Sequence, residues 1–183
     1  MPASVNITPH SPCRSRIQLG NGHMITFDTP KACFNYRTAA VVLHDDHVLL
    51  CREAGSDFWF LPGGRCELME SSHEAIRREI REELGTDGTV ERLLWIAENF
   101  FTLGDRPFHE IGLYFVVSLD AKSSLLDKAR LLPFREAVGI DLEARWFPLD
   151  QVSSINLLPA FLRNGLLRLP SSPQHIIHRE GSS

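Results

Sequence analysis

Apolar residues occur along the chain in short runs that are separated by turn-forming residues. Residues 15–19 and 23–27 flank Gly20-Asn21-Gly22, and Asn-Gly tolerates the positive φ angles of a tight turn. This pattern predicts a β-hairpin near the N-terminus. Ala39 to Leu43 is continuously apolar, as expected of a strand that is buried on both faces.

A second hairpin is predicted where residues 36–43 meet residues 48–51 across the polar segment 44–47. Residues 58–61 predict a short strand that ends at Pro62-Gly63-Gly64, because proline and glycine interrupt regular structure.

The clearest helix covers residues 71–84. Ser71 and Glu74 have the spacing of a capping box, and Gly85 stands where a C-terminal cap belongs. Ile76, Ile80 and Leu84 recur every four residues, so one helix face is expected to pack on the core.

The rest of the chain alternates between β-rich and irregular segments, which indicates a mixed sheet with helices on its faces, an α/β fold. The further predicted elements are strands at 89–103 and 108–119 around a turn at 104–107, a loop with a helical piece over 120–141, a strand at 144–149, a helix over 158–169 and a strand at 175–178.

Three carboxylates are concentrated on the predicted helix. Glu79, Glu82 and Glu83 stand at i, i+3 and i+4, so they project from one side and repel one another. Two of them lie in the last turn, where the helix dipole disfavours anions by about 0.3–1 kcal/mol each. Arg78 is placed to pair with Glu82 or Glu74 and offset part of this cost.

A bound divalent cation would offset the remainder, because Mg²⁺ and Mn²⁺ prefer hard oxygen ligands. The alternative is a solvated helix face held by salt bridges. Gly63-Gly64 lies a few residues upstream, and residues without a Cβ let the backbone approach a metal or phosphate closely. Together, the glycines and the spaced glutamates favour the cation site.

The same segment resembles the signature of the Nudix hydrolases, G-x5-E-x7-R-E-U-x-E-E-x-G-U, in which U is a bulky aliphatic residue. The matching positions are Gly64, Glu70, Arg78, Glu79, Ile80, Glu82, Glu83 and Gly85. Thr86 at the final U is the one departure. The likeness extends over roughly residues 36–169.

The resemblance implies an α/β/α sandwich with a mixed sheet, in which the signature forms a loop–helix–loop motif. It implies metal binding by Glu79, Glu82 and Glu83, joined in several members by a backbone carbonyl at the position of Gly63. The residues at Glu70, Arg78, Gly64 and Gly85 would shape the site. The family cleaves a nucleoside diphosphate linked to another group, by water attack on phosphorus.

Other residues are candidates for the remaining roles. The general base is expected to be Glu79 or Glu110, with an exposed strand glutamate as the alternative for the latter. Arg37 and Arg52 could donate to phosphate, although ordinary surface pairing explains them equally well.

Phe58 and Trp59 could stack on a base, although aromatic residues in strands more often pack in the core. The substrate is less specified. Family members often carry a proline or a tyrosine some 15–17 positions beyond the signature, where this chain has Phe101 to Leu103. We therefore expect a nucleoside-triphosphate or similar pyrophosphohydrolase. Alternatives are a nucleotide-sugar or ADP-ribose pyrophosphatase and a non-catalytic nucleotide-binding regulator.

Composition adds limits. The chain has 183 residues, of which 43% are hydrophobic and 23% charged, with a net charge of −4. These values are typical of a single globular domain. We assign this domain to residues 15–178, between tails at 1–14 and 179–183. Mild acidity argues against DNA binding, and no apolar run suits a membrane span. Cys13, Cys33, Cys51 and Cys66 form no zinc or disulfide pattern, so a cytoplasmic protein is expected, and a homodimer is possible for the family.

Overall fold

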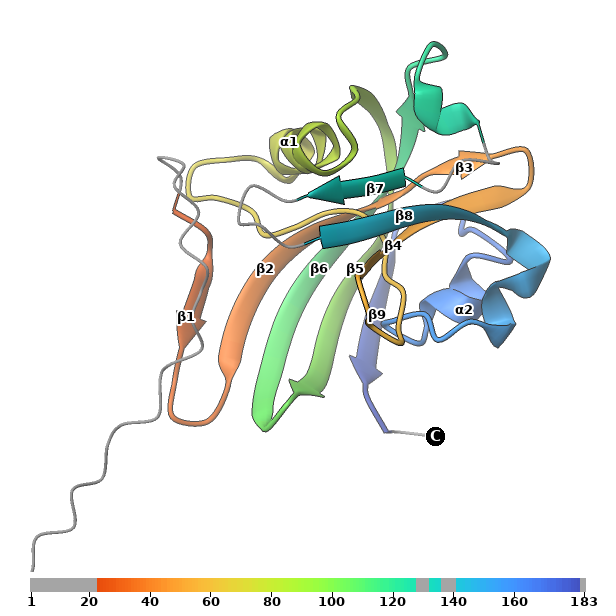
Figure 1. The fold of residues 1–183 in the computed structure, drawn as a ribbon. Helices are drawn as coiled ribbons and strands as arrows, with labels where there is room; N and C mark the ends of the chain where they lie inside the picture. Colours follow the sequence, from red (N-terminus) through yellow and green to blue (C-terminus); the bar gives the residue numbers. More distant parts are fainter. Residues whose placement is uncertain (1–22, 128–131, 136–140, 182–183) are drawn as a thin grey trace, which may run out of the picture.

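Two sheets organise the computed structural model, which describes residues 23–127, 132–135 and 141–181. The first has the strand order β1 (Thr26–Asp28), β2 (Cys33–Val41), β6 (Arg106–Leu119), β5 (Gly88–Leu103), β9 (Gln174–Arg179). The second has the order β3 (Leu43–His44), β4 (His47–Glu53), β8 (Asp141–Pro148), β7 (Leu132–Arg135) (Figure 1). In the first sheet, β2 runs parallel to β6 and β9 runs parallel to β5, whereas its other pairs are antiparallel, so this sheet is mixed. All strand pairs of the second sheet are antiparallel.

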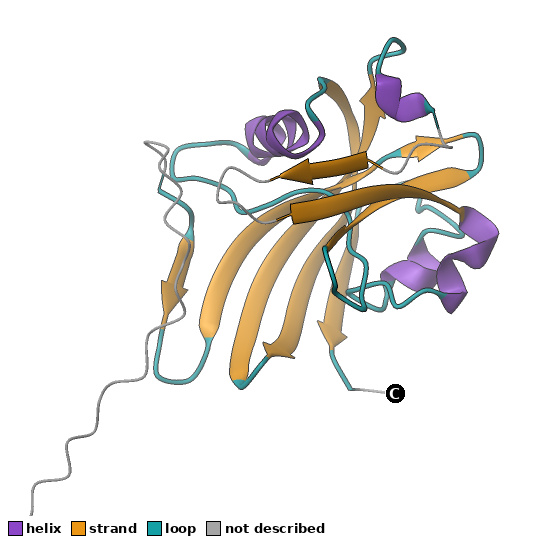
Figure 2. Cartoon of the chain, viewed as in Figure 1, coloured by secondary structure: helices purple, strands orange, loops and turns teal. Residues whose placement is uncertain are grey.

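Helical elements cover both sides of these strands (Figure 2). The helices are α1 (Ser72–Leu84), η1 (Ser124–Leu126), η2 (Leu149–Ser154) and α2 (Leu162–Gly165). Ala39 and Val41 of β2 pack in the core with η2 and α2, whereas Ala40 and Val42 pack in the core beneath α1. The continuous apolar run is therefore buried on both faces, and the predicted α/β/α arrangement is confirmed.

α1 forms as its sequence pattern predicts. The Ser71 side chain accepts from the Glu74 amide while the Glu74 carboxylate accepts from the Ser71 amide, and Gly85 ends the helix with φ of 64°. Ile76 and Ile80 are fully buried and Leu84 is nearly so. These contacts fix the rotation of α1, and with it the direction of its glutamates.

The loop before α1 is fixed along the edge of β2. The Ala40 amide donates to the Pro62 carbonyl at 2.8 Å, and the Thr38 amide donates to the Gly64 carbonyl at 2.9 Å. This loop therefore holds Gly63 and Gly64 between the sheet and the helix.

The predicted hairpin of residues 36–43 with 48–51 is confirmed only next to its turn, where Leu43 pairs with Val48. Only β3 pairs with β4, around a two-residue turn in which Asp45 and Asp46 have φ of 43° and 59°. β2 instead pairs with β6, and β4 pairs with β8. A local apolar pattern predicts strands well, but parallel partners come from distant segments.

The helix predicted over residues 158–169 is much shorter in the structure, where α2 covers Leu162–Gly165. The Leu158 amide donates to the Trp59 carbonyl of a distant segment, and Pro159 has no amide hydrogen to donate. Residues 158 and 159 therefore do not continue the helix. The predicted strand at 58–61 forms isolated bridges, from Phe60 to Cys51 and from Trp59 to Leu157.

Other predictions differ from the structure in detail. β5 and β6 are confirmed, with a tighter turn at Gly104-Asp105, and β8 and β9 are confirmed with shifted ends. Segment 120–141 contains η1 as its helical piece but also the unexpected β7. β1 pairs with β2, and residues 15–22 of the predicted first hairpin lie outside the described residues.

Cys33, Cys51 and Cys66 are buried and form no disulfide, and Cys13 lies outside the described residues. Among the described residues, no helix has the length and apolar character needed to span a membrane.

Packing of α1 can be tested with two isoleucines. Ile80 is fully buried, whereas Ile177 on β9 is 62% exposed. Ile80→Ala should lower the free energy of unfolding by about 2–5 kcal/mol because it removes buried methyl groups and leaves a cavity. Ile177→Ala is the control and should cost less than about 1 kcal/mol. Urea unfolding measures both, and equal losses would contradict the assigned packing.

Candidate active site

Arg78 is the central donor of the candidate site. Its Nε and Nη2 donate to the two carboxylate oxygens of Glu70, each at 2.9 Å. Its Nη1 donates to Glu79 at 2.7 Å and to Glu82 at 3.2 Å, and its Nη2 also donates to the Arg65 carbonyl at 3.0 Å. One guanidinium thus joins the loop to two helix glutamates. Of the two partners predicted for it, Arg78 pairs with Glu82, while Glu74 serves the helix cap.

Glu70 is the fixed counter-ion of this arrangement. Its Oε2 also accepts from the Glu67 amide at 3.0 Å. Burial alone would raise the pKa of Glu70, but the hydrogen bonds from Arg78 and the Glu67 amide outweigh burial and lower it. Glu70 therefore stays ionised and holds Arg78 in place.

Glu79 has a different environment. It is 8% exposed, and burial raises its pKa even though Arg78 and Arg37 oppose that shift. Arg78 and Arg37 therefore do not fully offset the cost of burying the ionised Glu79 carboxylate, and a further positive charge beside it would be favourable.

Glu83 and Glu82 differ in exposure although they are adjacent. Glu83 is 5% exposed, and its Oε2 accepts from the Gly63 amide at 2.8 Å. The Glu82 side chain is 44% exposed. Glu83 therefore ties the end of α1 to the glycine loop, while Glu82 lies at the boundary with solvent.

The two glycines are required by close contacts within the protein. Gly63 has φ of 136°, and a Cβ there would lie 2.3 Å from the Thr38 carbonyl oxygen and 2.8 Å from the Ala39 Cα. A Cβ on Gly64 would lie 2.3 Å from a carboxylate oxygen of Glu79. The close approaches in the structure are toward β2 and Glu79, and the approach to a metal or phosphate that the sequence suggests stays a prediction.

Arg37 contacts the loop from β2. It is partly buried, and its Nη2 donates to the Gly63 carbonyl at 2.6 Å and to the Leu61 carbonyl at 3.5 Å. Burial alone would lower its pKa, but Glu110 and Glu83 outweigh burial and raise the pKa. The carbonyl that the resemblance offers as a metal ligand thus already accepts one hydrogen bond.

Glu110 lies on β6 beside this group. It is 7% exposed and is in register with Asn35 of β2 and Asn99 of β5. Burial together with the Glu110 carboxylate raises the pKa of Tyr114, four residues further along the strand. Glu110, Glu83 and Glu79 all act on the charge of Arg37.

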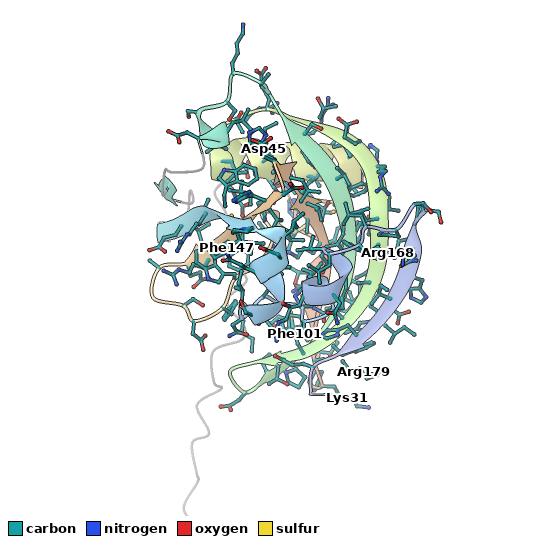
Figure 3. All side chains as sticks on the ribbon, turned by 90° about the vertical axis from the view of Figure 1, so that its right-hand side faces the viewer. Lys31, Asp45, Phe101, Phe147, Arg168 and Arg179 are labelled. Carbon is teal, nitrogen blue, oxygen red and sulfur yellow. The ribbon has the colours of Figure 1, made fainter. Side chains whose placement is uncertain are left out.

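Arg52, Phe58 and Trp59 are not brought into this group. Arg52 pairs with Glu143 at 2.8 Å, and its Cζ lies 4.5 Å from the centroid of the Trp59 ring. Trp59 is buried against Phe147 of β8, which Figure 3 labels, with ring centroids 4.7 Å apart. Trp59 is therefore a core residue, the alternative to stacking on a base, and Phe58 packs near Phe60.

Arg65 and Asn35 belong to the group although sequence reasoning did not select them. The Asn35 Oδ1 accepts from Arg65 Nε at 3.0 Å and from the Thr26 hydroxyl at 2.9 Å. The available signals were an arginine directly after Gly63-Gly64 and the polar residues in the first half of β2, among them Asn35.

Divalent cations suit the chemistry of this group. The carboxylates of Glu70, Glu79, Glu82, Glu83 and Glu110 outnumber the guanidinium groups of Arg37, Arg65 and Arg78 by five to three, which leaves two uncompensated negative charges. Within the described residues, however, no three acidic, histidine or cysteine side chains converge as a ligand set. Arg78 separates Glu79 from Glu82, so a cation would have to replace part of that contact.

Comparison with known proteins decides the family. Residues 35–168 match the NUDIX domain, which is more than half of the chain. The chain belongs to the Nudix family. Nudix hydrolases generally use divalent metals and act on nucleotide derivatives.

Individual relatives support the same assignment. An RNA pyrophosphohydrolase of Halorhodospira halophila is 43% identical over 133 residues, which cover 65% of this chain and 71% of that protein. A Bacillus subtilis relative is 32% identical over 94 residues, 51% of this chain and 43% of its own length. The chain thus matches less than half of that relative. The crystal structure of a UDP-X diphosphatase superposes with a TM-score of 0.55 at 26% identity, covering 82% of this chain and 68% of that one.

The glycine loop gives a test of the site's construction. Gly104 also has a positive φ, of 60°, but a Cβ there would meet nothing within 4 Å. Gly104→Ala should therefore cost roughly 1–2 kcal/mol from backbone strain alone. Gly63→Ala should cost more, because it adds overlap with β2. Urea unfolding of both variants measures the difference, and a Gly63→Ala protein as stable as Gly104→Ala would contradict the described contact.

The pKa of Glu79 gives a second test. A raised folded-state pKa means that the folded protein loses stability as the pH rises from the ordinary carboxyl range through that higher value. Glu79→Gln removes this loss. The difference between the thermal midpoint of Glu79→Gln and that of the parent should therefore increase in favour of the variant as the pH rises, and become constant above the raised pKa. Thermal unfolding in EDTA between acid and neutral pH measures this. A variant that instead falls steadily behind the parent would show that the Glu79 pKa is not raised.

Proposed function

We propose that the protein is a pyrophosphohydrolase that depends on a divalent cation and cleaves a nucleoside diphosphate linked to another group. The observation that supports it most is the assembly of Glu79, Glu82 and Glu83 beside Arg78 with an excess of negative charge. A phosphate substrate carries negative charges as well, so bare carboxylates would repel it. The cation is therefore part of the proposal.

Glu79, Glu82 and Glu83 would hold Mg²⁺ or Mn²⁺ through their carboxylate oxygens. The bound cation would neutralise phosphate charge and lower the pKa of water. Arg78, anchored by Glu70, keeps the helix carboxylates oriented toward the loop. The Gly63 amide fixes the rotamer of Glu83 from the opposite side.

In the proposed reaction, the oxygen of a water molecule forms a bond to phosphorus, and the bond from phosphorus to the bridging anhydride oxygen breaks. The proton of the water passes to a carboxylate, and the leaving phosphate departs with the bonding electron pair. Glu79 and Glu110 are the candidates for that carboxylate. Glu79 has a raised pKa, which suits a group that accepts a proton, and Glu110 is buried close to Arg37.

For the substrate, we propose a nucleoside triphosphate or a related nucleotide, with a nucleotide sugar or ADP-ribose as the alternative. The names of the relatives extend across RNA, CTP and UDP derivatives, which supports the diphosphate linkage as the shared element. Phe101, at the position where family members often differ, stacks on Phe108 with centroids 5.0 Å apart. We also propose a small-molecule substrate and a cytoplasmic location.

The function is tested by a panel of nucleoside diphosphate derivatives with and without Mg²⁺. Glu82→Gln and Glu83→Gln should each reduce the hydrolysis rate by several orders of magnitude, because each removes a charged oxygen from the cation. Both should keep the thermal midpoint near that of the parent. Phosphate-product release measures the rate.

Glu91→Gln is the matched control, because Glu91 is exposed on β5 and bonds to Ser118. It should retain full activity. Hydrolysis that is indifferent to EDTA, or near-native turnover in both Glu82→Gln and Glu83→Gln, would contradict the proposal. Nucleotide binding without hydrolysis across the panel would favour the regulatory alternative.

A further inference from the structure

The arginines around the glycine loop differ in what their charged ends contact. Arg78 is fully engaged by Glu70, Glu79, Glu82 and a carbonyl. Arg52 is paired with Glu143. An arginine in such an ion pair has less to offer a phosphate, because its charge is compensated and some of its donors are engaged.

Arg37 is also compensated. Its Nη2 holds the Gly63 carbonyl, and its charge interacts with Glu110, Glu83 and Glu79. A substrate phosphate at Arg37 would have to approach these carboxylates. Arg37 is therefore better suited to hold the loop than to receive an anion.

Arg65 has the opposite arrangement. Its Nε donates to the neutral Asn35 side chain, and among residues 23–127, 132–135 and 141–181 no carboxylate pairs with its guanidinium. Its backbone carbonyl accepts from Arg78, and it directly follows Gly64, which contacts Glu79. The backbone of Arg65 thus lies beside Arg78 and Gly64, and its guanidinium reaches Asn35, which is in register with Glu110.

The orientation of Arg65 is set by a buried amide. Asn35 is 4% exposed, and its Oδ1 accepts from both Arg65 and Thr26. The Thr26 Oγ1 is also 2.9 Å from the Phe34 carbonyl oxygen, so its one hydrogen is shared between this carbonyl and Asn35. A side chain held at Nε can still present both Nη groups as a fork, the geometry that binds two phosphate oxygens at once.

We propose that Arg65 binds the diphosphate group of the substrate and that Asn35 is the residue that positions it. This inference rests on the proposed function, since it assigns a substrate contact within the same site. It transfers the expected phosphate contact from Arg37 and Arg52 to a residue that sequence reasoning did not select. Asn35 contacts no substrate atom and acts through Arg65.

The direct test is calorimetric binding of inorganic pyrophosphate in the presence of Ca²⁺, with the full chain. Arg65→Met should raise the dissociation constant roughly tenfold to a hundredfold, the usual effect of losing a charged hydrogen bond. Arg92→Met is the matched control, because Arg92 is exposed on β5 and bonds to the Pro170 carbonyl. It should leave the dissociation constant unchanged.

Asn35 is tested by a double-mutant cycle. Asn35→Ala should weaken pyrophosphate binding in the parent but have no further effect in Arg65→Met, because its contribution passes through Arg65. A purely structural role would give the same loss in both backgrounds and would overturn the positioning role. If Asn35→Ala does not fold, Thr26→Val removes the second donor to Asn35 and takes its place in the cycle.

The outcomes separate this inference from the proposed function. A parent that hydrolyses nucleotides, with an unchanged pyrophosphate dissociation constant and KM in Arg65→Met, would overturn the assignment of Arg65 alone. A parent that binds pyrophosphate through Arg65 but hydrolyses no nucleotide would support Arg65 and overturn the proposed activity. A parent that does not bind pyrophosphate would overturn the assignment of Arg65.

Discussion

Placing carboxylates in a partly buried position is the constraint on which the rest of this site depends. Glu79 and Glu83 are both less than a tenth exposed, and burying an ionised carboxylate is costly unless charge and hydrogen bonds compensate it. The protein supplies Arg78 beside Glu79 and the Gly63 amide beside Glu83. The compensation is incomplete, as the raised pKa of Glu79 indicates. A cation would complete it.

Three elements of the fold, β2, the glycine loop and α1, position these groups. The apolar run of β2 is buried on both faces and therefore has a fixed position between the two cores. The glycine loop is bonded to β2, and the apolar stripe of α1 fixes its rotation. The Glu83 carboxylate and the Gly63 amide consequently meet. The elements that carry these groups are thus held by the core, although a cation would still have to replace part of the contact between Arg78 and the glutamates.

Local patterns in the sequence were sufficient for much of this. The capping box at Ser71 and the stripe through Ile80 predicted α1 correctly, whereas the cation site expected from the spacing of the glutamates stays a prediction. The failures involve partners that are distant in sequence. The parallel pairing of β2 with β6 and the short length of α2 depend on tertiary contacts that no local pattern contains. Arg65 was missed for the same reason, since its partner Asn35 lies 30 positions away.

The central claim is that the glutamates of α1 form a cation site that Arg78 holds ready. A crystal of the protein with Mn²⁺, measured for anomalous scattering, tests it most directly. The account predicts one or more Mn²⁺ peaks bonded to carboxylate oxygens of Glu82 and Glu83 or Glu79, with Arg78 still paired to Glu70. Mn²⁺ bound elsewhere, with Arg78 still joining Glu79 to Glu82, would contradict it.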